Sequence, residues 1–174
     1  MTLRKILTEP NEILRKKSLE VEGVDKDLQK LMDDMLETMY AAPGIGLAAI
    51  QVGIPKRIIV LDIEQKEGQK NPLFFINPEI IEKSKNLLTY EEGCLSVPGQ
   101  FAEIERPDRC HIKYLDYNGE KKEINAKGML ATCIQHEMDH LEGILFIDYL
   151  SKLKKSMIIK KLSKQKKVLE RIVV

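Results

Sequence analysis

The chain has 174 residues, 43 % hydrophobic and 32 % charged, which is the composition of an ordinary folded protein rather than a disordered or membrane one. No apolar run approaches the roughly 20 residues that span a bilayer, and the opening MTLRKILTEP lacks the apolar core of a signal peptide. Cys94, Cys110 and Cys133 are an odd number without a close-spaced pair, so we expect a reducing, cytoplasmic setting with no membrane association and no disulfide framework.

The net charge of +1 conceals an uneven distribution. Residues 151–174 hold nine basic residues and one acid, a net charge of +8, which leaves 19 basic and 26 acidic residues in 1–150, a net charge of −7. The body is therefore acidic and the tail strongly basic. Because there is no repeat, low-complexity linker or Pro/Gly-rich boundary, we expect one domain over residues 1–174.

The first half of the chain predicts one helix followed by strands. Apolar residues recur at steps of three and four from Asp25 to Tyr40, which predicts a helix, and Pro43 with Gly44 and Gly46 ends it. The strands that we predict are Arg57–Ile63, Leu73–Ile81 with an interruption near Pro78, Phe101–Ile104, Cys110–Tyr117 and Lys121–Asn125. The last two form a hairpin through the turn DYNGE.

The last part of the chain is predicted to be helical. A helix begins at about Gly128, and Gly143 fits the residue just past its end. A basic C-terminal helix is expected at about 152–167, with its lysines outward and one apolar stripe packed on the domain, formed by Leu150, Leu153, Met157, Ile158 and Leu162. The predicted class is α+β, with mixed or antiparallel strands around a central helix and a C-terminal helix.

The segment QHEMDHLEG places two histidines and an acid on the predicted central helix. His136 and His140 are four residues apart, so both imidazoles lie on one helical face and can reach one metal ion. Glu137 points off that axis, close enough to hold a water without ligating the ion. The alternative is a solvated helix face, which is less favoured because the chain has only three histidines and uses two of them here.

A catalytic site of the zinc type needs a third protein ligand. A metzincin would have histidine where this chain has Phe146, and a thermolysin-like site would have only Glu170, near the end of the last helix. Cys133 shares the helical face, but an ion held by the histidine pair lies about 7.5 Å along the axis, beyond the reach of about 5 Å of a cysteine. Cys94 remains the favoured third ligand, with a buried structural thiol as the alternative.

Three motifs, GIGLAAIQ (44–51), EGCLS (92–96) and QHEMDHLEG (135–143), follow one another along the chain. Together they resemble the three motifs of peptide deformylases, and the segments LTEPNEILRKKS and ERPDRCHIKYLDYNGE resemble bacterial-type members, so that the likeness covers essentially the whole chain. Phe101 departs from the pattern, because many bacterial members are expected to carry a basic residue there. The departure concerns a charged contact near the substrate entrance and not the chemistry.

Such enzymes remove the formyl group from the N-terminal formyl-methionine of newly synthesised proteins. The resemblance implies a single catalytic domain that binds a metal through Cys94 and the two histidines, with Glu137 in proton transfer. The amide of Gln51 and the backbone N–H of Leu95 would bind the developing oxyanion. The thiolate suits Fe(II), Zn(II), Ni(II) or Co(II), and the resemblance favours Fe(II) in the cell.

The substrate would be a formyl-methionyl nascent peptide. Gly44 and Gly46 allow close backbone approach, so an extended peptide could pair with this segment like an added strand, although a plain turn is the alternative. Met129 and Cys133, one turn apart, are candidates for an apolar slot that takes methionine. Asp139 is either a partner that orients a neighbouring group or a solvated acid.

Two other classes of function share some of these features. A zinc-type endopeptidase would use the same base and metal, but the chain does not supply its third ligand. A non-catalytic binding module stabilised by a metal would close the fourth coordination position, and no fourth ligand is evident.

The basic C-terminal helix predicts a polyanionic partner. Eight lysines and no acid lie between residues 151 and 167, and like charges at i and i+4 destabilise an isolated helix. Because the substrate emerges from a ribosome, we expect this helix to contact ribosomal RNA. A solvated helix face is the alternative.

Overall fold

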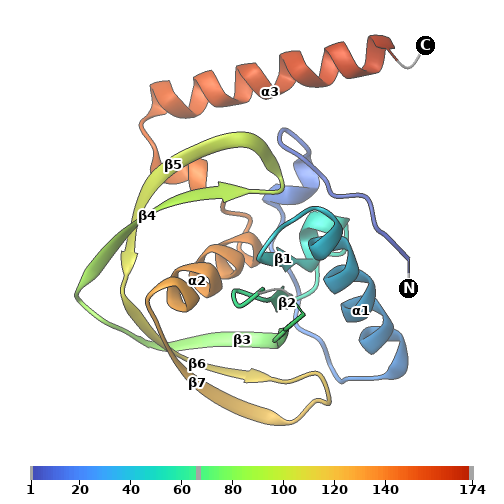
Figure 1. Ribbon diagram of the computed structural model, residues 1–174, viewed down its shortest axis with the longest axis vertical. Coiled ribbons are helices and arrows are strands. Elements are labelled where there is room, and N and C mark those ends of the chain that lie inside the picture. The colour runs from blue at the N-terminus through green and yellow to red at the C-terminus, as the bar shows by residue number, and fades with distance from the viewer. Residues whose placement is uncertain (1, 66–67, 173–174) are drawn as a thin grey trace.

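The computed structural model describes residues 2–65 and 68–172, and Figure 1 shows strands arranged around one central helix. A five-stranded antiparallel sheet has the order β1-β2-β3-β6-β7. Its strands are β1 (Gly46–Ala48), β2 (Ile58–Leu61), β3 (Leu73–Lys83), β6 (Arg109–Leu115) and β7 (Lys121–Lys127). A second sheet pairs β4 (Leu87–Cys94) antiparallel with β5 (Val97–Pro107). The predicted α+β class is confirmed.

Among the described residues, three α-helices and three short 3₁₀ helices complete the fold. The α-helices are α1 (Lys26–Ala41), α2 (Met129–Leu141) and α3 (Lys152–Ile172). The 3₁₀ helices are η1 (Glu12–Arg15), η2 (Ala49–Val52) and η3 (Phe146–Tyr149). Within the described residues, no helix combines the length and apolarity needed to cross a membrane.

Helix α1 begins and packs as its sequence predicts. The Asp25 side chain caps it by accepting a hydrogen bond from the backbone N–H of Leu28 at 2.8 Å. The face that carries Leu28, Met32 and Met35 is buried with residues of β1 and β2 in one apolar cluster. This packing fixes the segment between α1 and β1, which forms one wall of the cavity described below.

Helix α2 is the centre of the fold because most of its residues are buried against the surrounding strands β1, β2, β5 and β7. Gly128, with φ of +61°, precedes it, and Gly143, with φ of +73°, follows it. A Cβ on Gly143 would collide with the backbone of Arg15, so glycine is required there for space as well as for conformation. The predicted position of this helix is confirmed.

The strands differ from the prediction in extent. β3 continues through Pro78, and the predicted interruption is a register shift between Ile76 and Glu79, beside Asn77 with φ of +49°. β5 extends well beyond the predicted Phe101–Ile104. Outside the predicted range, only Val97 is both apolar and buried, and Pro98, Gly99 and Pro107 are poor strand formers. The apolar alternation that marks a half-buried strand is therefore weak along its length.

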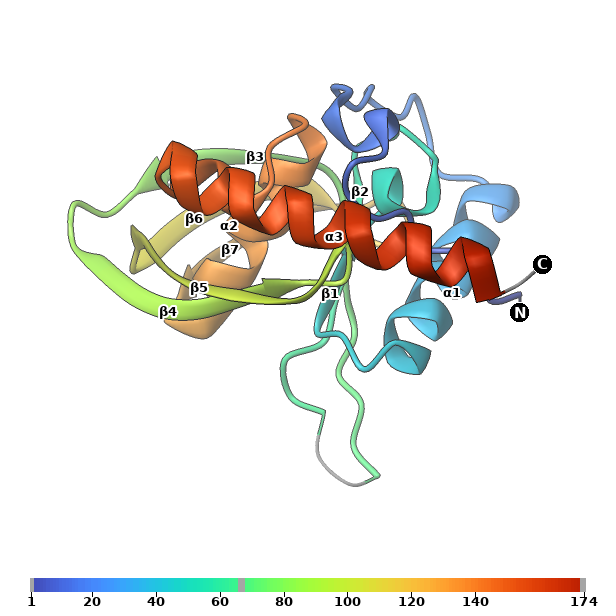
Figure 2. The same cartoon turned by 90° about the horizontal axis from the view of Figure 1, so that it is seen from above.

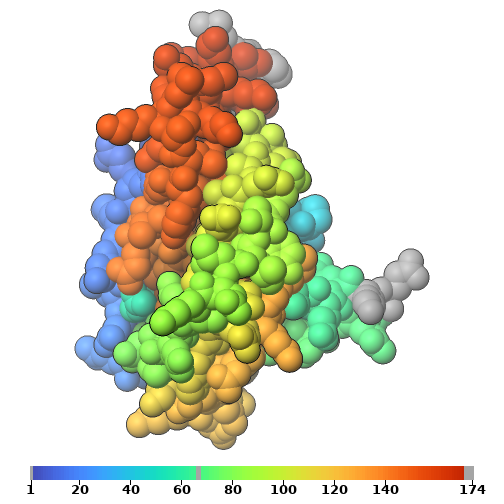
Figure 3. Space-filling model, turned by 90° about the vertical axis from the view of Figure 1, so that its left-hand side faces the viewer, coloured from blue at the N-terminus to red at the C-terminus, as the bar shows by residue number. Residues whose placement is uncertain are grey.

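The predicted apolar stripe of α3 is wrong at two positions. Leu153 and Met157 are 72 % and 62 % exposed, whereas Leu162 is 4 % exposed and packs with Ile158 and Ile159. The reason is that α3 runs along the outside of the molecule and contacts β5 and η3 through a narrow strip (Figures 1, 2 and 3). The spacing of the apolar residues does not reveal which strip faces the body. The helix also extends past the predicted end at 167.

Candidate metal centre

Strand β4 and helix α2 bring three metal-binding side chains together. The ligand atoms of Cys94, His136 and His140 all lie within 4.8 Å of one another. Cys94 Sγ is 3.3 Å from His140 Nε2, close to the separation of about 3.5 Å that metal bonds of about 2.3 Å to sulfur and about 2.0 Å to nitrogen give in a tetrahedral site. The set predicted from the sequence therefore has the spacing of a single-ion site.

The protonation states of His140 and Cys133 fit such a site, whereas burial, which lowers the pKa of His136, is outweighed by contacts with Cys94 and Glu92 that raise this pKa well above its usual value. Burial lowers the pKa of His140 well below its usual value, so that its imidazole is neutral, as a metal ligand must be. Burial raises the pKa of Cys133 to about 12, so this residue is a thiol. Cys133 is not in the ligand cluster and lies in the wall of the adjacent cavity.

Glu92 orients the first histidine. Its Oε2 lies 2.8 Å from His136 Nδ1, which leaves the other ring nitrogen to face the centre. Arg106 contacts the same carboxylate through Nε at 2.5 Å and its terminal nitrogen at 3.0 Å. Burial raises the pKa of Glu92, but hydrogen bonds from His136 and Arg106 outweigh burial and hold the pKa below its usual value.

Sequence reasoning missed both Glu92 and Arg106. A signal for the first was present, because Glu92 and Cys94 are two residues apart on one strand and therefore face the same side. Asp139, expected either to orient a neighbour or to be solvated, accepts hydrogen bonds from Arg106 and from the Tyr149 hydroxyl, each at 2.8 Å. It thus supports Arg106 rather than a histidine.

Glu137 lies beside the centre without a fixed partner. The side chain is buried, and its Oε2 forms no hydrogen bond with any residue that the structure describes. Burial raises the pKa of Glu137 to about 7, which suits a group that accepts and returns a proton at neutral pH. A Cβ on Gly46 would stand 2.5 Å from Glu137 Oε1, so glycine is required there to make room for the carboxylate.

Two hydrogen bonds hold the Gln51 side chain beside Cys94. Its Oε1 accepts a hydrogen bond from the Ala48 N–H at 2.8 Å, and its Nε2 donates to Ser96 Oγ at 3.0 Å. The same nitrogen is 3.5 Å from Cys94 Sγ, so one amide hydrogen points toward the ligand cluster. This orientation is fixed by the chain itself.

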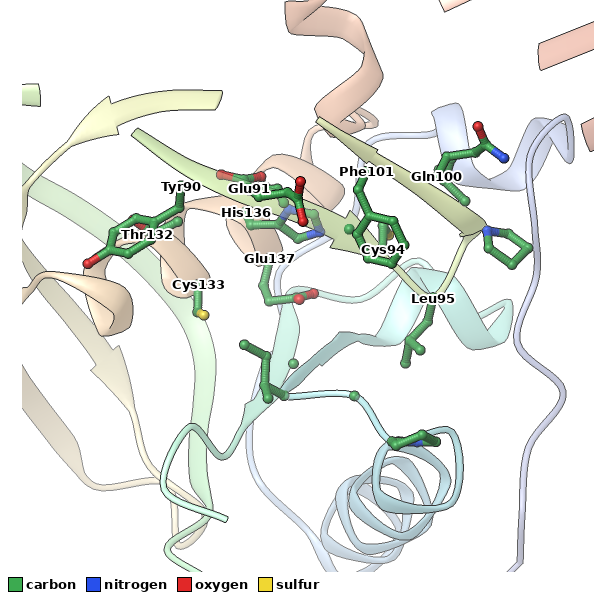
Figure 4. Close-up of a pocket in the computed structure, with 18 of the residues that line it drawn as sticks. Tyr90, Glu91, Cys94, Leu95, Gln100, Phe101, Thr132, Cys133, His136 and Glu137 are labelled. Atoms are coloured by element: carbon green, nitrogen blue, oxygen red, sulfur yellow. Dashed lines mark hydrogen bonds and ion pairs between the residues drawn. The ribbon is translucent and has the colours of Figure 1, made fainter. Parts of the chain in front are cut away.

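The centre opens into a cavity of about 460 Å³ (Figure 4). Its wall includes every residue predicted to contact substrate, namely Gly44, Gly46, Met129 and Cys133. Leu95 points from the turn after β4 toward Gly44, where an added Cβ would stand 2.7 Å from Leu95 Cδ1. A side chain at Gly44 would collide with Leu95, and one at Gly46 would collide with Glu137, so both positions require glycine. The sequence did not reveal these contacts.

Comparison with known proteins decides the family. The sequence model described as polypeptide deformylase matches residues 3–156. The chain belongs to this family. A peptide deformylase of Pelagibacter ubique is 68 % identical over 166 residues, which are 95 % of this chain and 96 % of the relative.

Solved deformylase structures share the fold. The peptide deformylase from Ehrlichia chaffeensis superposes with a TM-score of 0.91 at 45 % identity, covering 96 % of this chain and 98 % of that chain. A second structure of that enzyme, in complex with actinonin, superposes with a TM-score of 0.89 at 48 % identity, covering 95 % and 98 %.

The resemblance read from the three motifs is thereby confirmed. As a deformylase, the protein is a hydrolase that removes the formyl group from N-terminal formyl-methionine. Family membership decides against the two rival classes, the endopeptidase and the non-catalytic module.

Proposed function

We propose that deformylation takes place where Cys94, His136 and His140 converge, and that the chain acts as a single catalytic domain over residues 1–174. One observation carries this proposal: the three ligand atoms lie within 4.8 Å of one another, and Cys94 and His136 line a cavity of about 460 Å³ together with Glu137. The three side chains would hold a divalent ion, which would supply Lewis acidity and lower the pKa of a water.

Glu137 moves the proton. An amide is a poor electrophile, so its hydrolysis needs both an activated water and protonation of the leaving amine. Glu137 takes a proton from the attacking water and returns it to that amine. Three observations support this role. The Glu137 side chain is buried, its Oε2 forms no hydrogen bond with the described residues, and its pKa is raised to about 7.

Gln51 and Leu95 stabilise the developing oxyanion. The Gln51 amide is already fixed by Ala48 and Ser96, so binding an oxyanion requires little reorganisation. The backbone N–H of Leu95 directly follows Cys94 and is the second donor. Preorganised donors of this kind typically contribute about 10²–10³ in rate each.

The peptide binds in extended form along the cavity. β1, which contains Gly46, is an end strand of its sheet and pairs only with β2 among the described strands, so its outer edge can pair with a substrate backbone next to Gly44. The methionine side chain enters the slot between Met129 and Cys133, both in the cavity wall. A long, unbranched thioether suits such an apolar slot.

We propose Fe(II) as the ion in the cell, with Zn(II), Ni(II) or Co(II) able to replace it. One thiolate and two imidazoles suit all four ions. The free thiols of Cys94, Cys110 and Cys133 support a reducing, cytoplasmic setting, in which Fe(II) is maintained.

We also propose that α3 contacts ribosomal RNA near the exit of the nascent chain. Of its eight lysines, Lys155 forms an ion pair with Asp148 at 2.6 Å, and the other seven are exposed. An exposed row of cations is the surface that a phosphate backbone binds, and the affinity falls steeply with salt.

Formate release tests the proposed activity directly. The metal-loaded protein should release formate from formyl-Met-Ala-Ser while leaving its internal peptide bonds intact. Cleavage of an internal bond with no formate release would refute the deformylase mechanism. The test separates the two reactions because formate and peptide fragments are measured independently.

A further inference from the structure

In the part of the chain that the structure describes, three large exposed apolar side chains line the cavity, and one of them, Met129, is 48 % exposed and belongs to the proposed methionine slot. The other two lie at the mouth of the cavity: Phe101 of β5 is 64 % exposed and Ile45, just before β1, is 43 % exposed. The Phe101 ring lies against the backbone of Gly93, where an added Cβ would stand 2.5 Å from Phe101 Cε1. Figure 4 shows this ring on the side of the cavity from which Cys94 and Leu95 also come. An exposed aromatic ring thus lines the same cavity as a proposed metal ligand.

The charge at the mouth is negative. No lysine or arginine is among the described residues that line the cavity. Of the three acids that line it, Glu92 is paired with Arg106 and Glu137 is buried beside the centre. Glu91 is exposed and forms no ion pair with the described part of the chain. It is therefore the uncompensated charge at the entrance.

The route of the substrate brings its next residues to this mouth. This step rests on the proposed function, which puts the formyl group at the centre and methionine between Met129 and Cys133. Each further residue of an extended peptide advances about 3.3 Å, so the first two after methionine leave through the mouth. Their side chains pass Phe101, Ile45 and Glu91.

We propose that the mouth selects among substrates by the two residues that follow formyl-methionine: Phe101 favours an apolar side chain, and Glu91 disfavours an acidic one. Covering part of an exposed ring by an apolar side chain should raise kcat/KM roughly 5-fold over alanine. An acidic side chain within one Debye length of Glu91 should lower kcat/KM roughly 5-fold relative to its neutral isostere at low salt.

Two peptide series test the proposal, formyl-Met-X-Ala and formyl-Met-Ala-X, with X as Phe, Ala, Gln or Glu. In the parent, the Phe/Ala and Gln/Glu ratios of kcat/KM should each be about 5 in at least one series. Phe101→Ala should bring the Phe/Ala ratio to about one and leave the Gln/Glu ratio unchanged. Glu91→Gln should do the reverse. Leu88→Ala, which shortens a half-exposed leucine of β4 outside the cavity wall, is the control and should change neither ratio.

Ratios near one in both series of the parent, or ratios that persist in the matched variants, would overturn the proposal. Each variant is normalised to its own turnover of formyl-Met-Ala-Ala, so a general loss of activity does not alter the ratios. Absence of formate release from that reference peptide would count against the proposed function instead, so the two failures are distinguishable.

Discussion

The metal centre and helix α3 show two different ways in which this chain builds a functional region. At the centre, the buried carboxylate of Glu92 is held by the buried Arg106 and by His136 through contacts of 2.5 to 3.0 Å. On α3, seven of the eight lysines are exposed, and the eighth, Lys155, is the one that forms an ion pair within the described chain. A buried hydrogen-bonded network holds its side chains in one arrangement. An exposed helix with a net positive charge attracts a partner only through its electrostatic potential. We therefore expect changes at the centre to abolish chemistry and changes on α3 to leave it intact.

The largest effect is expected from removing the thiolate of the centre. Cys94→Ser should lose most bound metal and most activity, because a neutral hydroxyl is a far weaker ligand for a borderline-soft ion. Cys110→Ser and Cys133→Ser are matched controls that should keep the metal, since neither belongs to the ligand cluster. Metal content per folded chain is the measurement, and equal retention in Cys94→Ser would show that this residue is not a ligand.

Glu137→Ala should separate catalysis from metal binding. The variant keeps all three ligands, so its metal content should match the parent, while kcat should fall by about 10²–10⁴ because proton transfer is lost. Turnover of formyl-Met-Ala-Ser and metal content are measured on the same preparation. A rate above about a hundredth of the parent value would rule out Glu137 as the base.

Glu92→Gln tests whether the buried network tunes the metal. Loss of the charged partner of His136 and Arg106 should weaken metal affinity by roughly 10- to 100-fold while leaving some activity at saturating metal. The neighbouring Glu91→Gln is the control, because Glu91 is exposed and does not contact a ligand. Affinity is measured by competition with a chelator, and identical values for the two variants would remove Glu92 from the metal site.

Replacing lysines on α3 should have the smallest effect on the chemistry. In Lys160→Glu/Lys161→Glu/Lys164→Glu, co-sedimentation with ribosomes at low salt should collapse, whereas turnover of a short formyl-Met peptide should stay within about 2-fold of the parent, because the field of α3 is screened over about 10 Å. A triple lysine-to-glutamine variant should show a weaker loss. Undiminished ribosome binding would make α3 a solvated face and nothing more.

The sequence predicted the metal centre better than it predicted the packing of α3. The pair His136 and His140 lies on one face of α2 because four residues are about one helical turn, a spacing that no tertiary contact can alter. Helix α1 follows from an equally local rule, the recurrence of its apolar residues at steps of three and four. The distance between Cys133 and an ion at the histidine pair is also a property of one helix, so the exclusion of Cys133 from the ligand cluster agrees with the structure.

Only the tertiary structure decided which distant residues meet. Arg106 reaches Glu92 and Asp139 because β4 pairs with β5 and both lie against α2. Arg106 is 14 positions from Glu92 and 33 from Asp139 in the sequence, so no local pattern predicts these contacts. The face of α3 that packs was also undecided, since Leu153 and Leu162 are equally apolar and only the docking angle on β5 buries one and exposes the other. Local spacing thus determined the helices and the histidine pair, while the second layer around the metal depends on long-range packing, which a periodic pattern does not encode.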